Sequence, residues 1–543
     1  MHPGYNKLYI MNLLKTSLIA CAALLCIQSA HAVIDNPMTL AVIRVYDQQL
    51  QANPRDHLTY FRRGNEYYRH NEYVKALEDM DNAIRYSEDN RDGIRFQAFM
   101  IRAGIYNQTG KPHLALADLN SALELEPKSL SAIYQRANTL LELGQTDEAR
   151  KEYQRIQALN QRSPEAMIGL ARCAAADKNY VEAERLLEDA VSFDANQPEI
   201  YVRRAAVRKD MGDHDGAVED LLVAISLNSR DQRAIASLVE YGNTNYKAVI
   251  DGLTKAVESV PGNGLYRYLR ATIAQAHYNY LAAIDDFQTI IDQRLYNYHG
   301  LNASIARCQL GLGNYDEAQA QIDKAISDSG GRVAEYYVVR SRIMRATGRH
   351  DEAIAAAGHA MVIDRNYVPG LVEMALNYVD KKDYEQAIAV LGEASMLDAN
   401  DPEIYLLRAW IHDKYLNQPA AARQFNTQAL NVEGYADNNV SSLRGFALAA
   451  LDRGAEGDAW MDNIIATVPD NDGRINYIAS CYYMMRGYDD KALQAVERSL
   501  QAGYSDNHNW MNNTDGPVNA GVLRDDLRFL RLMQSYNSIF GKE

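Results

Sequence analysis

The pattern of apolar and polar positions between residues 60 and 88 predicts two short amphipathic helices joined by a turn. Apolar and small residues recur there at helical spacing: Tyr60, Gly64 and Tyr67 in the first helix, and Ala76, Met80 and Ala83 in the second. Gly64 and Ala76 are small enough to let the two helices cross closely, while larger side chains fill the space around the crossing. One such pair buries little surface, so the prediction depends on whether the pattern recurs.

The second-helix pattern does recur along the chain. Its anchor positions are Ala115/Leu119/Ala122, Ala149/Tyr153/Ile156, Ala183/Leu187/Ala190, Ala217/Leu221/Ala224, Val249/Leu253/Ala256, Ala283/Phe287/Ile290, Ala318/Ile322/Ala325, Ala353/Ala357/Ala360, Ala387/Leu391/Ala394, Ala422/Asn426/Ala429, Ala459/Asn463/Ala466 and Ala492/Val496/Ser499. Between Ala115 and Ala217 each step is 34 residues, and later steps drift by a few residues that fall in turns.

This unit resembles the tetratricopeptide repeat, a helix-turn-helix motif with the same step and the same small residues at its helix crossing. The resemblance implies an all-α fold, a right-handed superhelical solenoid of about thirteen repeats in which each unit packs on its neighbours. We expect a capping half-repeat over residues 33–56, the repeat array over 57–503, and a loop with a C-terminal capping helix over 504–543. The expected anchors of the two caps are Val42 and Tyr46, and Leu523, Leu527, Leu530 and Met533.

Glycine residues mark the turns within the pairs, because glycine accepts the left-handed backbone that ends a helix. They are Gly110, Gly144, Gly212, Gly313 and Gly348. Around residues 233–245 the unit shortens, and Tyr241-Gly242-Asn243 is expected to interrupt its first helix. The sequence therefore predicts an imperfect repeat there, with a local change in curvature.

An arginine precedes the small crossing residue in many first helices: Arg63, Arg102, Arg136, Arg204, Arg270 and Arg408. These arginines suit either a track for anions or a packing role, in which the stem lies along the neighbouring repeat and the head stays in water. Their phase faces the seam between repeats, which favours the packing role.

Residues 1–32 have the pattern of an export signal. Lys15 precedes an apolar run from Leu18 to Ile27, and Ala30-His31-Ala32 has the form of a cleavage site. We expect cleavage after Ala32 and an exported protein, periplasmic or associated with the cell envelope, without stable membrane insertion. An uncleaved anchor is an alternative, although the apolar run is short for a bilayer span. A lipid anchor at Cys21 is another, although the apolar region before it is short.

Removal of Lys7 and Lys15 with that segment leaves 54 basic and 71 acidic residues, a formal net charge of −17. This charge disfavours nucleic acid and anionic membrane surfaces, so neither is an expected partner. The cysteines outside the segment are Cys173, Cys308 and Cys481. On separate repeats they cannot come within disulfide reach, so we expect buried packing residues.

The sequence carries no pattern typical of a catalytic, metal or cofactor site. Its histidines are scattered, and neither His-Glu-x-x-His nor Cys-x-x-Cys spacing occurs. A Gly-x-Ser-x-Gly elbow is also absent from the sequence. Adjacent carboxylates such as Asp285-Asp286 and Asp525-Asp526 point apart on a helix. We therefore expect no enzyme, no cofactor and no metal.

The resemblance also implies a ligand groove, because positions one and five residues after the first aromatic anchor line the concave surface of the family. Carried onto this sequence, they include Phe61, Asn65, Tyr134, Asn138, Arg172, Tyr268, Arg307, Arg342 and Trp410. The asparagines suit the backbone amides of an extended peptide, and the arginines suit carboxylates. The family's best-known groove clamps the C-terminal carboxylate of heat-shock chaperones with lysines. Here Phe61, Met100 and Tyr134 stand at the lysine positions, which argues against a chaperone clamp.

The favoured interpretation is a non-catalytic scaffold of the cell envelope that binds proteins or extended peptides through this groove. The alternative is a protein that assists polysaccharide synthesis, export or binding, because exported superhelices of this family accompany such processes and a tyrosine-rich groove can stack sugars. An enzyme is the weakest interpretation, since no second domain is left over.

Overall fold

A computed structural model of the chain describes residues 37–87, 92–296, 298, 300–432, 438–468, 470, 473–504 and 526–536. Within these ranges it contains 28 α-helices and no strand. The chain divides into two compact units, an N-terminal unit that ends at Leu238 and a C-terminal unit that begins at Val239. Each is described by itself. The predicted export signal, residues 1–32, lies outside the described residues.

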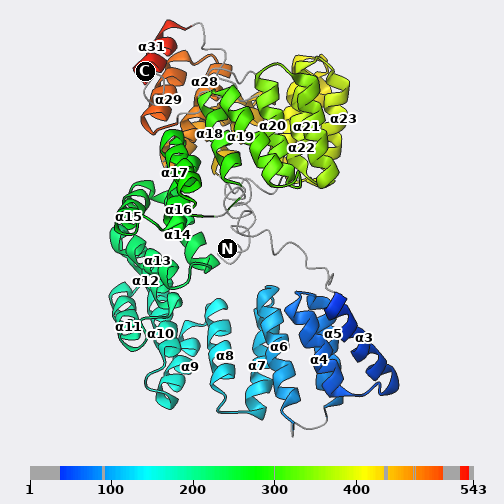
Figure 1. The fold of residues 1–543 in the computed structure, drawn as a ribbon, viewed down its shortest axis with the longest axis vertical. Coiled ribbons are helices and arrows are strands. Elements are labelled where there is room, and N and C mark those ends of the chain that lie inside the picture. The colour runs from blue at the N-terminus through cyan, green and yellow to red at the C-terminus, as the bar shows by residue number, and fades with distance from the viewer. Residues whose placement is uncertain are drawn as a thin grey trace. The chain divides into compact units, whose positions relative to one another are not determined.

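The N-terminal unit is a row of helix pairs that lie side by side in chain order after one single helix (Figure 1). Each pair packs on the pair before it. The helices are α3 (Pro37–Ala52), α4 (His57–Arg69), α5 (Tyr73–Tyr86), α6 (Ile94–Gln108), α7 (Pro112–Leu125), α8 (Leu130–Glu142), α9 (Thr146–Leu159), α10 (Pro164–Ala176), α11 (Tyr180–Phe193), α12 (Pro198–Met211) and α13 (His214–Leu227).

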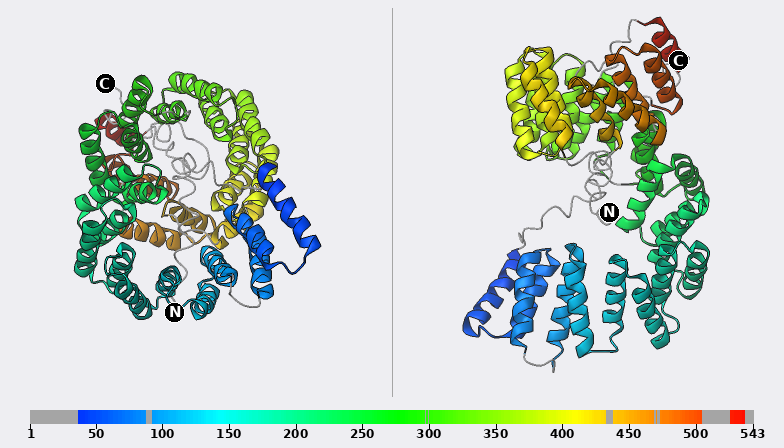
Figure 2. Two further views of the ribbon diagram at one scale, coloured as in Figure 1. Left: turned by 60° about the horizontal axis from the view of Figure 1, so that its bottom comes forward. Right: turned by 180° about the vertical axis from the view of Figure 1, so that it is seen from behind.

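The C-terminal unit repeats the arrangement of helix pairs (Figure 2). The boundary between the units falls within α14 (Gln232–Thr244). The further helices of the C-terminal unit are α15 (Tyr246–Ser259), α16 (Gly264–Ala276), α17 (Tyr280–Gln293), α18 (Leu301–Leu312), α19 (Tyr315–Asp328), α20 (Ala334–Ala346), α21 (His350–Ile363), α22 (Val368–Asp380), α23 (Tyr384–Leu397), α24 (Pro402–Lys414), α25 (Pro419–Asn431), α26 (Asn438–Ala450), α27 (Gly454–Thr467), α28 (Arg474–Met485), α29 (Asp489–Gln501) and α31 (Leu527–Ser535).

Taken in chain order, α4 to α29 form thirteen helix pairs, which confirms the predicted all-α repeat array. The predicted anchors are buried in most of the second helices; in α5, Ala76 and Met80 are both 0% exposed. Cys173, Cys308 and Cys481 are buried, as expected, and none of them forms a disulfide bond with another described residue. Burial raises the pKa of the Cys173 thiol to about 11. This thiol is therefore protonated near neutral pH and is a packing residue.

Two predictions about the array are wrong, one about the continuity of α14 and one about the buried face of α27. The helix α14 runs without a break through Tyr241-Gly242-Asn243, where an interruption was expected. In α27 the predicted anchors Ala459 and Asn463 are exposed, and the buried face starts instead at Gly457. The reason is the helix crossing: a Cβ on Gly457 would come within 2.9 Å of the Gly445 carbonyl oxygen, so only glycine fits there.

The terminal helices also differ from the predicted faces. In α3, Val42 is 39% exposed, and the neighbouring Ile43 is buried in its place. In α31, the predicted anchor Leu527 is 68% exposed, and Phe529 is buried in its place, whereas Met533 is buried as predicted. Each shift is one or two residues along the helix, because a terminal helix has only one neighbour to fix which face turns inward. Leu523 and the loop before it lie outside the described residues.

The arginines of the first helices form an arginine ladder, defined here as Arg63, Arg102, Arg204 and Arg270. Each donates two hydrogen bonds of 2.6–2.9 Å to the carboxylate sixteen residues later, on the second helix of its own pair. These carboxylates are Asp79, Asp118, Asp220 and Asp286, which are only 2–5% exposed. The expectation that the heads stay in water is therefore wrong, and the ladder is not an open track for anions.

The ladder also ties consecutive pairs together. Arg63 donates a further bond of 2.6 Å to Asp47 on the single helix α3, and Arg102 donates one of 2.5 Å to Asp81 on α5, the second helix of the preceding pair. Arg408 departs from the ladder, because its guanidinium carbon lies 4.1 Å from the ring centroid of Phe425. Desolvation on burial lowers the pKa of Arg408, in keeping with a cation that packs on an aromatic ring.

The turn within each pair places one residue at positive φ, in every pair except α14–α15. The predicted glycines hold this place in several pairs, but Lys178 holds it with φ 61°. A left-handed conformation costs a non-glycine residue about 1–2 kcal/mol. We expect Lys178→Gly to raise the free energy of unfolding by about 0.5–1 kcal/mol, measured by urea denaturation.

Gly212→Ala is the matched control, because Gly212 has φ 81° and no atom would lie within 4 Å of a Cβ added there. Alanine would therefore meet no steric clash, and only the strain of its left-handed backbone would lower the free energy of unfolding, by about 1 kcal/mol. Shifts of the same sign in both variants would contradict the assignment.

Asp401 caps α24, with its Oδ1 accepting a hydrogen bond of 2.8 Å from the Glu403 backbone N–H. Burial, and then the charge of Glu403, raise the pKa of Asp401 to about 7. Because this folded-state pKa lies above the ordinary value of 3.8, the group stabilises the fold at low pH. That contribution is lost as the pH rises through about 7.

We expect Asp401→Asn to flatten this part of the pH dependence, since asparagine keeps the cap acceptor without the charge. Urea unfolding of both proteins between about pH 4 and pH 8 measures it. A variant whose stability falls as steeply as the parent's would assign the effect to another group.

Candidate ligand-binding surface on the first helices

The predicted ligand residues lie on first helices in both units, and each unit is considered separately. In the N-terminal unit they are Phe61 and Asn65 on α4, Tyr134 and Asn138 on α8, and Arg172 on α10. In the C-terminal unit they are Tyr268 on α16, Arg307 on α18, Arg342 on α20 and Trp410 on α24.

The structure brings Tyr134, Asn138 and Arg172 together around Tyr153, which comes from the second helix α9. The Tyr153 hydroxyl donates to Asn138 Oδ1 at 2.8 Å, and Arg172 donates to the same oxygen. The ring of Tyr134 lies edge-on to Tyr153, with centroids 6.2 Å apart. Asn138 Oδ1 therefore already has two donors, and the amide nitrogen is the part of Asn138 suited to a peptide carbonyl.

A carboxylate borders this cluster. Glu142 lies one turn after Asn138 on α8 and is exposed. Desolvation raises the pKa of Glu142, and the charge of Arg172 opposes that increase. The Arg172 charge is therefore partly offset by a neighbour on the preceding first helix. Phe61, on α4, packs against the buried Met80 group, and Asn65 is half-buried on the same helix.

In the C-terminal unit, Arg307 and Arg342 lie around Tyr367, which precedes α22. Burial raises the pKa of the Tyr367 hydroxyl to about 12, with the charge of Glu335 adding to the increase and Arg342 and Arg307 opposing it. Arg307 donates to Glu335 at 2.7 Å and to Ser304 Oγ at 3.1 Å. Its charge is thus paired within the protein.

Arg342 is held differently, at one end only. Its Nε donates to Glu373 Oε2 at 3.2 Å, while Arg345 Nε donates to Glu373 Oε1 at 2.8 Å. Glu373 is 2% exposed, and the Arg342 side chain is 50% exposed. Burial would raise the pKa of Glu373, but the charges and hydrogen bonds of Arg345 and Arg342 lower it. An ionised, buried carboxylate therefore fixes a solvent-facing guanidinium.

The other two predicted residues lie in different surroundings. Tyr268 is 3% exposed, because the rings of Tyr296 and Tyr298 pack on it, with centroids 5.3 and 5.9 Å from its own. Tyr268 is therefore not part of the candidate surface. Trp410 is half-buried, 5.1 Å from the ring of Tyr415, with the Lys414 ammonium 5.2 Å from its centroid. Sequence reasoning missed Tyr367 and Glu373, since neither stands at the concave positions of the repeat.

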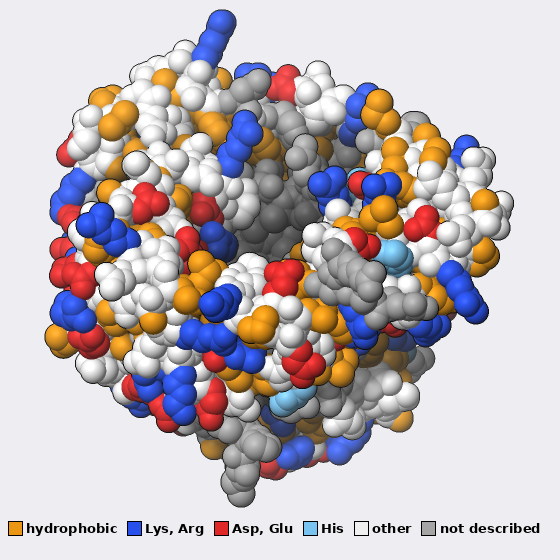
Figure 3. Space-filling model, turned by 90° about the horizontal axis from the view of Figure 1, so that it is seen from below, with side chains coloured by type: hydrophobic (Ala, Val, Ile, Leu, Met, Phe, Trp, Pro, Cys, Tyr) orange, Lys and Arg blue, Asp and Glu red, His pale blue; other side chains and the backbone are white. Residues whose placement is uncertain are grey.

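Charge and metal-binding chemistry add little to this picture. On the face in Figure 3, acidic and basic side chains lie intermixed with apolar ones. In the described ranges, no three His, Cys, Asp or Glu side chains are grouped so that they could hold a metal ion. Among the same residues, no helix is long and apolar enough to span a membrane.

Comparison with protein-family models matches tetratricopeptide repeats at residues 134–198, 304–367 and 344–411. The curated relatives include the DnaJ homolog subfamily C member 7 homolog of Schizosaccharomyces pombe. It is 22% identical over 353 residues, which are 63% of this chain and 63% of that protein. Human tetratricopeptide repeat protein 7B is 29% identical over 133 residues, 24% of this chain. The chain covers 63% of the first relative's length and 16% of the second's.

Solved structures similar to the chain include yeast Tom70, with a TM-score of 0.36 and 15% identity over 76% of this chain and 97% of that one. Another is YrrB, described as a TPR protein with an unusual peptide-binding site, with a TM-score of 0.27 and 20% identity. It matches 35% of this chain and 96% of its own.

Proposed function

Because the chain contains tetratricopeptide repeats, we propose that it is a non-catalytic scaffold that binds proteins or extended peptides through its first helices. Proteins built from such repeats are generally protein-binding scaffolds. The observation that carries the proposal is Arg342: its guanidinium faces solvent while the buried Glu373 fixes its Nε. A guanidinium held in this way is preorganised for a carboxylate or a peptide carbonyl, because little side-chain freedom remains to be lost on binding.

The N-terminal unit supports the same proposal with a second polar cluster. Asn138 and Arg172 are locked to each other and to Tyr153, so their remaining donors have fixed directions. Fixed donors on consecutive first helices suit a ligand that runs along the repeats. A linear peptide bound in this way reaches micromolar affinity, about −8 kcal/mol.

The experiment is a selection of peptides on the full-length protein, followed by measurement of Kd for the selected peptide. We expect Arg342→Ala to weaken binding, since it removes the exposed donor group. Arg340→Ala is the matched control, because Arg340 lies on the same helix but faces Asp323 of α19 at 3.3 Å. Equal losses in both variants, or no loss in either, would overturn the role of Arg342.

We also propose that the protein acts outside the cytoplasm, in the cell envelope. The support is the sequence of residues 1–32, where an apolar run precedes Ala30-His31-Ala32. Mass spectrometry of the protein from its native source measures the mature N-terminus. A first residue of Val33 is the expected result, and a retained segment 1–32 would contradict it.

A further inference from the structure

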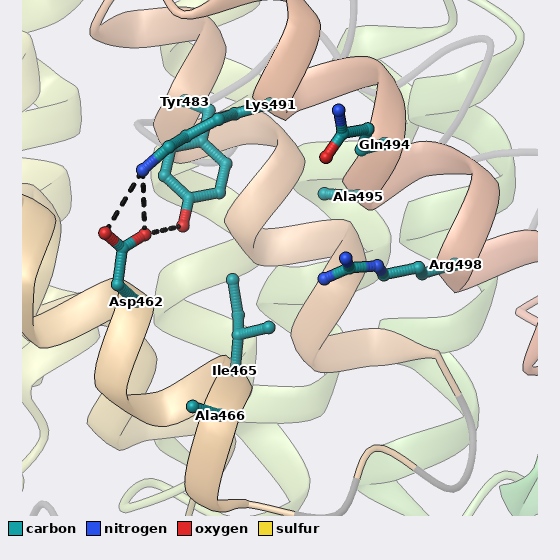
Figure 4. Close-up of a pocket in the computed structure, with 8 residues that line it drawn as sticks. All are labelled: Asp462, Ile465, Ala466, Tyr483, Lys491, Gln494, Ala495 and Arg498. Carbon is teal, nitrogen blue, oxygen red and sulfur yellow. Dashed lines mark hydrogen bonds and ion pairs between the residues drawn. The ribbon is translucent and has the colours of Figure 1, made fainter.

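A pocket of about 370 Å³ opens between α27 and α29, the second helices of the last two pairs. Its floor is apolar, with Ile465 and Ala466 on α27 and Ala495 on α29. Figure 4 shows Arg498 reaching from α29 into the space beside Ile465 and Ala466. The pocket therefore lies between second helices, whereas the candidate surface described above lies on first helices.

The arginine ladder is absent from the last pair. Ala479 stands where the ladder has its arginine, and Ala495 stands sixteen residues later, where the ladder has its aspartate. A ladder arginine also reaches the preceding second helix, as Arg102 reaches Asp81. In the last pair that helix contributes Asp462, which lines the pocket together with Ala495. Two lining residues, Asp462 and Ala495, thus stand at positions equivalent to Asp81 and Asp118, which Arg102 contacts in its own pair.

The charges around the pocket are unequally satisfied. At one end, Lys491 Nζ lies 3.1 Å from both oxygens of Asp462, and the Tyr483 hydroxyl donates to Asp462 Oδ1 at 2.5 Å (Figure 4). Asp462 therefore already has its counterion. At the other end, Arg498 is exposed, and no described residue pairs with its guanidinium. The lining charges sum to one positive charge, located at Arg498.

We propose that this pocket binds a carboxylate carried on a short apolar stem, presented by a glutamate side chain of a partner protein. The carboxylate accepts hydrogen bonds from Arg498, and the neighbouring Gln494 amide offers a further donor. The methylene stem packs on Ile465, Ala466 and Ala495, the apolar floor of the pocket. This site is additional to the first-helix surface and gives the scaffold a second contact point on its second helices.

The test uses the full-length protein and three acetylated pentapeptides in isothermal titration calorimetry. One has the sequence Ser-Gly-Glu-Gly-Ser with an amidated C-terminus, the second has Gln for Glu, and the third is the Gln peptide with a free C-terminal carboxylate. We expect the Glu peptide to bind about fivefold more tightly than the Gln amide. A preference for the free-acid peptide in place of the Glu peptide would overturn the assignment to a glutamate side chain.

Two variants and one control locate the effect. Arg498→Glu should abolish the preference for the carboxylate peptide, and Ala466→Phe, which fills the pocket without changing charge, should do the same. Lys324→Glu is the control, because Lys324 is an exposed cation at the equivalent position of α19 and should leave the preference intact. Equal affinity for all three peptides, no binding at millimolar concentration, or an equal loss in Lys324→Glu would overturn the proposal. Since Arg498 and Ala466 are both exposed, circular dichroism should show that each variant folds.

Discussion

Arg102→Ala should be among the most damaging single changes in the N-terminal unit, lowering the free energy of unfolding by about 3–5 kcal/mol. The Asp118 side chain is 7% exposed and receives bonds of 2.8 and 2.6 Å from Arg102. Removal of the guanidinium leaves a buried carboxylate without its counterion. Because a long repeat array does not unfold all-or-none, amide hydrogen exchange of α6 and α7 is the measurement, supported by urea unfolding.

Arg185→Ala is the matched control, because its hydrogen-bond distances are nearly the same, although its side chain is exposed and its partners lie on its own helix, α11. Arg185 donates to Glu182 at 2.8 and 2.6 Å and to Asp189 at 2.7 Å, but its side chain is 55% exposed. Water replaces these partners when the arginine is removed, so we expect a loss under about 1 kcal/mol. Equal losses in the two variants would show that bond geometry, and not burial, decides the stability.

A second comparison separates the cost of an unpaired charge from the value of the pair. We expect the double variant Arg102→Met/Asp118→Leu to recover much of the stability that Arg102→Ala loses, because apolar side chains of similar volume satisfy the buried site. Protection in α6 that stays as low in the double variant as in Arg102→Ala would contradict this account.

The helix pairs of the repeat array could be predicted because each needs a small residue at its helix crossing, and these residues recur at a nearly constant interval. A helix crossing admits only a small side chain, so positions such as Ala76 and Ala149 repeat and reveal the helix pairs. This reasoning fails in α27, because Gly457 and Ala459 are both small enough for the crossing. The sequence does not show that the Gly445 backbone approaches Gly457, which makes Gly457 the crossing residue. The arginines of the ladder could be recognised in the sequence, but their aspartate partners could not. The partners lie on the second helix of each pair, and only the constant separation of sixteen residues would have indicated them.

The candidate surface could be predicted only where the repeat itself places the residues. Asn138 and Arg172 stand at the same position of consecutive first helices, so their meeting follows from the 34-residue step. Glu373 and Tyr367 approach Arg342 through the reach of individual side chains, which no period encodes. Tyr268 is covered by Tyr296, which belongs to an irregular connection between α17 and α18.

Gly169→Ala should be the other severe change, because it affects the core and the candidate surface together. A Cβ at this position would lie 2.2–2.5 Å from the ring carbons of Tyr153, which is 0% exposed. The ring must move, and its hydroxyl then loses the 2.8 Å bond to Asn138. We expect a loss of about 1–3 kcal/mol in the free energy of unfolding, measured by hydrogen exchange of α9 and α10. Binding of a peptide ligand to this unit should weaken as well.

The control for Gly169→Ala is the same substitution at Gly392, in the middle of α23, where no atom lies within 4 Å of a built Cβ. Alanine there should stabilise the helix by about 0.5–1 kcal/mol, since only the backbone entropy of glycine is removed. The two Gly→Ala changes thus have opposite expected signs.

Combining Gly169→Ala with Tyr153→Leu should lower the free energy of unfolding by less than the sum of the separate changes, because the smaller side chain no longer meets the new Cβ. Strict additivity would show that the damage arises elsewhere in the crossing of α9 and α10.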